Sequence, residues 1–142
     1  DWIPKELTIV ARASGSKSAV GQLPELSKDK TSDHLNWLAS VLAEARNVSK
    51  ADHFGLFGSS IAATWMAGAI GSSVKFFIDE DPARIGNRHL ARPIIGPPDI
   101  PPGSVIFVPL LSHIAQTVAA RLHGPNRDIH IPRPLQAQPH LI

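Results

Sequence analysis

Residues 53–82, HFGLFGSSIAATWMAGAIGSSVKFFIDEDP, decide the fold that we expect for this chain. A short apolar run at 53–57 predicts a strand, and a second apolar run at 74–78 predicts another. The residues between them predict a helix that ends at Gly71 and whose apolar face is formed by Ile61, Trp65, Met66, Ala69 and Ile70. Strand, helix and strand in this order form the first half of a nucleotide-binding βαβ unit.

The turn before this helix carries the expected ligand chemistry. A phosphate at a helix N-terminus meets unpaired N–H groups and the positive end of the helix dipole. The dinucleotide fingerprint G-x-G-x-x-G aligns with Gly58, Ser60 and Ala63, so one glycine of three is kept. Asp79 lies 21 residues after Gly58, where the fingerprint has an acid that bonds ribose hydroxyls. Ser59 or Ser60 is expected to cap the helix. The alternative is that Gly58 only forms a turn and Asp79 only ends a strand.

Composition narrows the class of protein. At 142 residues the chain suits one domain with a substantial core. It has no cysteine, which excludes disulfides, cysteine zinc sites and thiol catalysis, and fits a cytoplasmic protein. The net charge of +2 does not indicate nucleic acid as a partner. The uncharged run 54–74 predicts no membrane span, because turns divide it and a span needs about 20 continuous apolar residues.

Positive charge gathers in the second half of the chain. Residues 84–142 contain six arginines, no lysine and two aspartates, whereas residues 1–83 carry a net charge of −2. Arginine suits a phosphate-bearing ligand, and a solvated basic surface is the alternative. In this half, His89 in the loop from Arg84 to Arg92 is the expected phosphate contact. The acids at 79–81 form either a metal site or a solvated turn, and we expect the turn; no histidine has a recognised zinc spacing.

The remaining sequence alternates between helical and extended patterns. We expect helices at 32–46 and 111–122, an extended piece at 93–95, and strands at 104–109 and 127–132, the last at a sheet edge because of its prolines. The stripes expected to be buried are Leu35, Leu38, Val41, Leu42 and Ala45 in the first helix and Leu111, Ile114, Ala115, Val118 and Leu122 in the second. Trp37 lies off its stripe and is expected at the edge of the core.

The alternation predicts an α/β fold, a Rossmann-like three-layer sandwich with a mostly parallel sheet and helices on both faces. Ligands of such sheets bind beyond the carboxyl ends of the strands. The residues expected to gather at that edge are Gly58, Ser59, Ser60, Asp79, Arg84 and Pro109.

Two parts are expected along the chain. Residues 1–31 contain a strand pattern at 5–12, KELTIVAR, followed by a small, polar linker at 13–31. We expect this part to be the last strand of a preceding domain and its linker. Residues 32–142 are expected to form the Rossmann-like domain.

From about Asp33 to Leu122 the chain resembles the C-terminal domain of the sugar C-methyltransferases. The matching residues are Phe57-Gly58-Ser59-Ser60, Phe77-Ile78-Asp79, Asp81-Pro82, Gly86, the proline-containing segment Arg92–Pro98 and the strand Val105–Pro109. KELTIVAR also resembles the last strand of that family's methyltransferase domain. The pattern from Asp79 to Gly86 is also similar to the N-terminal domain of sugar-nucleotide acetyltransferases. Both resemblances imply a nucleotide sugar as the ligand.

This resemblance implies a transferase context. The parent enzyme would methylate a nucleotide-linked sugar with S-adenosylmethionine, whose site belongs to the preceding methyltransferase domain. The present chain would then carry no catalytic residue and no cofactor of its own. It would contribute Gly58, Ser59, Ser60, Asp79, Arg84 and His89 to the substrate site.

Three other interpretations remain open. The spacing from Gly58 to Asp79 also suits an independent domain that binds a nicotinamide dinucleotide. Gly58-Ser59-Ser60-Ile61-Ala62 is near the nucleophile elbow of serine hydrolases, with an acid from Asp99 or Asp128 and a base from His113, His123 or His130. The chain could also be a packing or oligomerisation module without a ligand.

Overall fold

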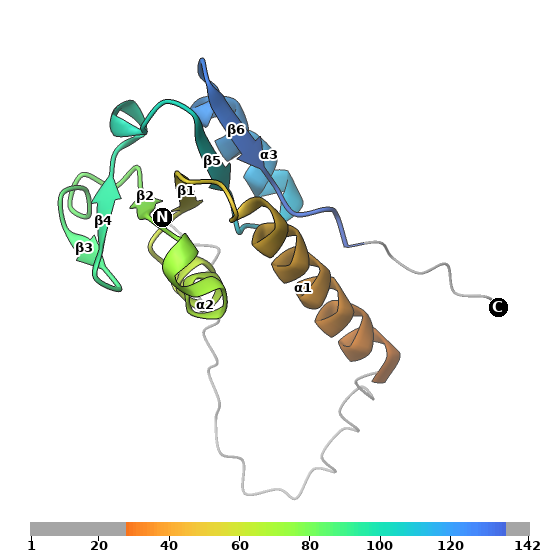
Figure 1. The fold of residues 1–142 in the computed structure, drawn as a ribbon. Helices are drawn as coiled ribbons and strands as arrows, with labels where there is room; N and C mark the ends of the chain where they lie inside the picture. Colours follow the sequence, from red (N-terminus) through yellow and green to blue (C-terminus); the bar gives the residue numbers. More distant parts are fainter. Residues whose placement is uncertain (1–27, 136–142) are drawn as a thin grey trace, which may run out of the picture.

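The computed structural model describes residues 28–135 of the chain (Figure 1). The strand expected at 5–12 lies outside the described residues. The elements, in chain order, are α1 (Lys28–Val48), β1 (Phe54–Phe57), α2 (Ile61–Ile70), the 3₁₀ turn η1 (Gly71–Ser73), β2 (Phe76–Ile78), β3 (Arg88–His89), β4 (Arg92–Ile95), the 3₁₀ turn η2 (Pro97–Asp99), β5 (Ser104–Phe107), α3 (Ser112–Leu122) and β6 (Arg127–His130). Because α1 begins at Lys28, the last residues of the expected linker are helical, and the linker prediction is wrong there.

The strands form one sheet in the order β3-β4-β2-β1-β5-β6. All neighbouring pairs are parallel except β3 and β4, which are antiparallel. Numbered among themselves, the five parallel strands follow the order 3-2-1-4-5, the order of the first five strands in the dinucleotide-binding fold. The predicted α/β class with a mostly parallel sheet is therefore confirmed. The strand order reverses between β1 and β5, which defines the topological switch point.

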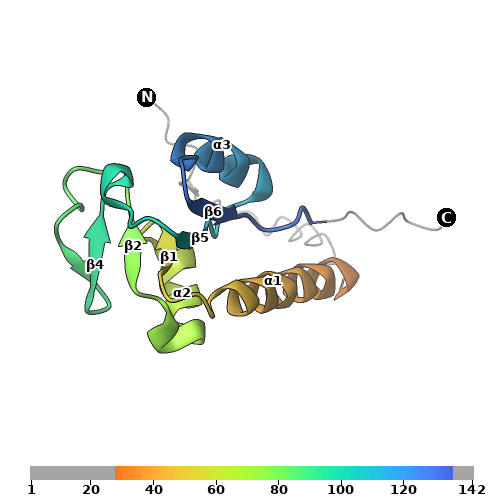
Figure 2. The ribbon, with the colours of Figure 1, turned by 45° about the horizontal axis from the view of Figure 1, so that its top comes forward.

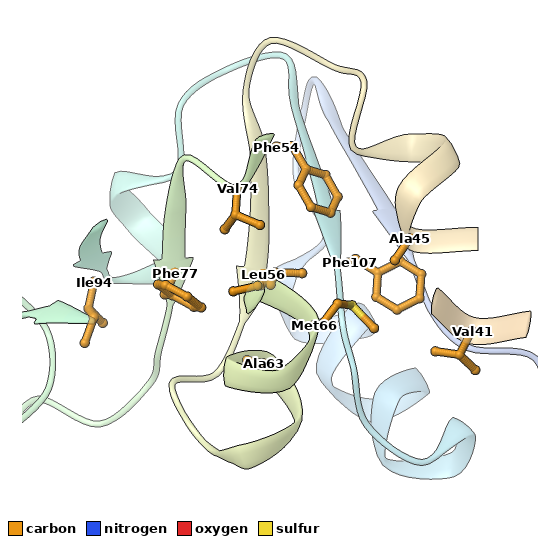
Figure 3. Packing of buried hydrophobic residues seen from close by; sticks show 11 residues of the cluster. Val41, Ala45, Phe54, Leu56, Ala63, Met66, Val74, Phe77, Ile94 and Phe107 are labelled. Carbon is orange, nitrogen blue, oxygen red and sulfur yellow. The ribbon is translucent and has the colours of Figure 1, made fainter. Parts of the chain in front are cut away.

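One face of the sheet is covered by α1 and α2 (Figures 2 and 3). Alternate strand residues turn their side chains to this face, so Phe54 and Leu56 of β1 lie beside Phe77 of β2 and Phe107 of β5. From the helices, Val41, Ala45, Ala63, Met66 and Ala67 complete the cluster. Burial of each large side chain in it is worth about 1.5–3 kcal/mol relative to exposure.

The opposite face of the sheet is covered by α3, so the molecule has three layers (Figure 2). Here the intervening strand residues meet the helix, and the buried cluster is formed by Phe57, Phe76, Ile78, Ile100, Ile106, Val108, Ala115, Val118 and Leu122. Only glycine fits at Gly55 of β1, because a Cβ there would lie 2.3 Å from the ring of Phe76 on the neighbouring strand β2.

The expected apolar faces of the helices are only partly correct. In α1, Val41 and Ala45 are buried, but Leu35 and Leu38 are exposed, because the N-terminal half of the helix extends past the sheet (Figure 2). In α3, the C-terminal part of the stripe is buried as predicted, whereas Leu111 and Ile114 are exposed.

In α2 the predicted face is partly correct. Met66 is buried as expected, but Ile61 and Trp65 are exposed and Ala63 and Ala67 face the sheet instead, so the buried face is rotated from the predicted one. This helix has no charged residue, so periodicity offers no polar side from which its orientation could be fixed. Its small residues on the sheet side allow a close approach of helix and sheet.

The hairpin of β3 and β4 was not anticipated beyond the extended piece at 93–95. Its two turn residues, Leu90 and Ala91, have φ of 47° and 62°. Hairpin turns with two positive φ values normally carry Asn-Gly or similar pairs, so the sequence gives no signal here. Arg92 anchors the hairpin by donating to the carbonyls of Val74 and Gly71, each at 2.7 Å. The edge strand expected at 127–132 is present as β6.

Candidate ligand-binding site

The turn between β1 and α2 is fixed by its first residue. Gly58 has a φ of +83°, which L side chains rarely adopt, and its N–H donates to the Ile78 carbonyl at 2.6 Å. A Cβ at this position would meet only the Ser60 Oγ, at 3.9 Å. The backbone conformation, and not crowding, therefore requires glycine, and the space beside Gly58 is open.

Helix α2 begins in this open space. Ser60 stands at the N-cap position with extended backbone (φ −97°, ψ −171°), but its side chain makes no capping bond to the described residues. Its carbonyl accepts from both the N–H and the hydroxyl of Thr64, at 2.9 and 2.8 Å. The first N–H groups of a helix have no carbonyl partner within it, and no acid lies in this first turn. The start of α2 thus presents donors and a positive dipole end at the carboxyl edge of the sheet.

Asp79 follows β2 and is buried, with 8% of its surface exposed. Its Oδ2 accepts from the Ser59 hydroxyl at 2.7 Å and from Arg84 Nη1 at 3.3 Å, and its Oδ1 accepts from the Asp81 N–H at 3.1 Å. Burial raises the pKa of Asp79, but the bonds from Ser59, Asp81 and Arg84, with the charge of Arg84, outweigh burial together, so the pKa lies below its ordinary value. The carboxylate is therefore held ionised and oriented.

Arg84 is the exposed member of this group. Its guanidinium contacts Asp79 and the Ser59 hydroxyl through Nη1, both at 3.3 Å, and Asp81 Oδ2 through Nε at 3.4 Å. About half of its side chain is exposed to solvent. The guanidinium is thus positioned by two acids while one side of it remains accessible, a geometry that suits an oxyanion ligand.

Four of the expected site residues come together: Gly58, Ser59, Asp79 and Arg84. Ser60 adjoins them and is exposed. Pro109 follows β5, whose parallel pairing with β1 places its carboxyl end at the same edge. Of the two serines expected to cap α2, Ser60 stands at the N-cap position without a side-chain bond, and the Ser59 hydroxyl donates to Asp79 instead.

His89 has other contacts. Its Nε2 lies 2.7 Å from the Thr64 hydroxyl, and its ring packs edge-on against Phe77 with centroids 4.8 Å apart. It pairs with Arg92 across the β3–β4 hairpin. Through these contacts the half-buried His89 connects β3 to α2. They do not support the expected phosphate contact.

One residue near the site was missed by sequence reasoning. Arg121, in the last turn of α3, donates to both carboxylate oxygens of Glu80, at 2.9 Å from Nε and 2.6 Å from Nη2. The acids 79–81, expected as a solvated turn, are therefore each bonded to an arginine. The partners are 41 residues apart, and the arginine-rich second half was the only available signal.

A separate hollow of about 410 Å³ lies between α1, the start of α3 and the segment after β6. It is lined by His34, Trp37, Leu111, Ser112, His113, Gln116, Pro134 and Leu135. Trp37 packs against the edge of the core, as expected, and donates from Nε1 to the Arg133 carbonyl at 2.7 Å. Its lining includes no residue of the Gly58 turn.

The hydrolase interpretation loses its geometric basis. A nucleophile elbow holds its serine in a strained turn, whereas the backbone of Ser60 is ordinary and extended. His130 does pair with the expected acid Asp128 at 2.9 Å, but among the described residues no hydrogen bond joins a histidine to the Ser60 hydroxyl. Within residues 28–135, no group of three or more histidines or acids could hold a metal ion. No helix in this part of the chain is long and apolar enough to cross a membrane.

Comparison of the chain with protein-family models, curated proteins and solved structures finds no match. The fold class therefore stands on the strand order and the layers alone, and the function on the geometry of the site.

Proposed function

We propose that this domain binds a phosphate-bearing nucleotide ligand at the carboxyl edge of β1 and β2. The observation that carries the proposal is the group of Ser59, Asp79 and Arg84 next to Gly58, beside the switch point of a doubly wound sheet. Each residue of this group comes from a connection that leaves the carboxyl end of a parallel strand, where such sheets bind ligands.

The cationic and the anionic members of this group can contact different parts of the ligand. The start of α2 and the accessible side of Arg84 favour phosphate oxygens. A carboxylate has about four acceptor positions, and the described contacts of Asp79 use three. The fourth, on Oδ1, suits a hydroxyl of the ribose or of a linked sugar.

In the context that the sequence pattern implies, the ligand is a nucleotide-linked sugar and the parent protein is an S-adenosylmethionine-dependent C-methyltransferase. The domain shapes the substrate side, packs against a preceding methyltransferase domain and carries no catalytic residue itself. This part of the proposal is tested by the coding sequence upstream of Asp1. A methyl-donor glycine loop preceded by cysteines at zinc spacing supports it, and an unrelated upstream sequence contradicts it.

Binding is tested by calorimetry of the 142-residue chain against uridine and thymidine diphosphates, with uridine as the control that lacks phosphate. We expect saturable binding of the diphosphates below millimolar concentration and much weaker binding of uridine. Absence of heat for every ligand at millimolar concentration would contradict the proposal and favour a packing module.

The second candidate is a nicotinamide dinucleotide ligand, which the strand order and the position of Asp79 favour. Against it, Ser60 and Ala63 replace two glycines of the dinucleotide fingerprint. Titration with NADH, followed by nucleotide fluorescence, separates the two. Binding of NADH tighter than that of uridine diphosphate would reverse the ranking.

A further inference from the structure

The ion pair between Glu80 and Arg121 joins the two halves of the sheet. Glu80 follows β2 directly after Asp79, whereas Arg121 belongs to the helix that follows β5. Because α3 shares its buried cluster with Phe57 of β1 and Ile78 of β2, the pair ties this helix to the loop that follows β2. Nothing in local sequence requires this contact, since 41 residues separate its partners.

The geometry of the pair is that of an arginine with an oxyanion. Both carboxylate oxygens accept from one guanidinium, in the two-pronged arrangement that arginine also makes with phosphate. Half of the Arg121 side chain is exposed, and Glu80 is also partly exposed. The pair is therefore accessible to a competing anion, and its opening requires no core residue to move.

The position of Glu80 links this pair to the site. It lies between Asp79 and Asp81, which both contact Arg84. Two guanidiniums, from Arg84 and Arg121, are thus held by three consecutive carboxylates. A ligand with one phosphate can be served by Arg84 and the start of α2, whereas a diphosphate presents a second anion for which a second cation is needed.

We propose that Arg121 is a second phosphate-binding residue of this site and that Glu80 occupies it as an internal substitute until a diphosphate displaces the carboxylate. This inference rests on the proposed function. It assigns the ligand to nucleoside diphosphates, including their sugar esters, and not to monophosphates. It also makes Glu80 a competitor whose removal strengthens binding.

The test compares Glu80→Gln, Arg121→Gln and the double variant of the full chain, titrated calorimetrically with uridine diphosphate and uridine monophosphate. We expect Glu80→Gln to bind the diphosphate about threefold to tenfold more tightly and Arg121→Gln to bind it about tenfold more weakly, the scale of one charge-assisted hydrogen bond. Glu80→Gln should bring no gain when Arg121→Gln is also present. Monophosphate affinity should change little in all three.

Glu44→Gln is the control, because Glu44 of α1 is also paired with an arginine, through a single contact to Arg133 Nε at 2.8 Å. It should leave the diphosphate affinity unchanged, and thermal unfolding of each variant verifies that it is folded. If wild type binds uridine diphosphate but Glu80→Gln and Arg121→Gln bind it equally well, the inference is wrong while the proposed function stands. If no variant binds any nucleotide, both fail.

Discussion

The connections that follow β1 and β2 are both ordered, but different interactions stabilise them. After β1, the chain turns at Gly58 and enters α2 within a few residues, and the helix buries its Ala63, Met66 and Ala67 side against the sheet. After β2, no helix forms before the parallel strand β4; instead, Asp79–Arg84 make a network of ion pairs and the chain returns through a short hairpin.

This difference shows where each region obtains its order. The turn after β1 is held by the packing of α2 and by the hydrogen bond from the Gly58 N–H to Ile78, so the first N–H groups of the helix are left available. The loop after β2 lacks a packed helix and is held by its own side chains, with Asp79 as the central acceptor. A site between the two connections therefore combines the unpaired N–H groups at the start of α2 with the fixed charges of Asp79 and Arg84.

The largest effect is expected from Asp79→Ala, which breaks the network after β2. It removes the acceptor of three hydrogen bonds and leaves Arg84 and the Ser59 hydroxyl without this partner. We expect a loss of about 2–3 kcal/mol in the free energy of unfolding, measured by urea denaturation. A loss below about 0.5 kcal/mol would mean that the loop does not depend on this carboxylate.

Gly58→Ala tests the turn after β1. A side chain at a φ of +83° is strained, so we expect a loss of about 1–2 kcal/mol in stability and weaker binding of uridine diphosphate. Gly71→Ala is the matched control, since it has a φ of +78° and equally open surroundings but lies at the other end of α2. It should cost similar stability without loss of affinity. Equal losses of affinity in both variants would show that uridine diphosphate does not bind specifically at the Gly58 turn.

The contribution of Asp79 should depend on pH in a defined direction. Its pKa in the folded protein lies below the ordinary value, so the stabilisation is present above the unfolded pKa, near 3.8, and is lost as the pH falls through the folded value. The stability difference between wild type and Asp79→Asn, measured by thermal unfolding, should therefore shrink on acidification below about pH 4. A difference that grows in acid would show the opposite shift.

The smallest effect is expected at the exposed side of α2. Ile61 is 88% exposed, so Ile61→Ser should change the free energy of unfolding by no more than about 0.5 kcal/mol. Met66→Ser on the same helix, which replaces a fully buried side chain, should cost several times more. Similar losses in both variants, measured by urea denaturation, would contradict the observed rotation of the helix.

The predictable features were those set by local pattern. The elements β1, α2 and β2 could be predicted from two apolar runs with a glycine–serine turn and a helical pattern between them. Parallel strands need a crossover of this kind. Parallel pairing then brings the ends of β1 and β2 together, so Gly58, Ser59 and Asp79 could be placed at one edge in advance. Arg84 followed from its position in the loop after Asp79.

The features that escaped prediction depend on contacts distant in sequence or on uncommon backbone. The rotation of α2 is decided by which small residues fit the sheet, and an uncharged helix carries no trace of that choice. The hairpin at Leu90 and Ala91 uses positive φ at residues that rarely adopt it. The Glu80–Arg121 pair depends on where α3 lies above the sheet, which no local pattern specifies.

The most direct test of the site is an amide chemical-shift titration of the ¹⁵N-labelled 142-residue chain with uridine diphosphate, with uridine as the reference. If phosphate binds where β1 meets α2, the largest shifts will fall on the amides of residues 58–63 and on the Arg84 side chain, and uridine will not reproduce them. Saturable shifts centred elsewhere, or no shifts at millimolar diphosphate, would contradict the account.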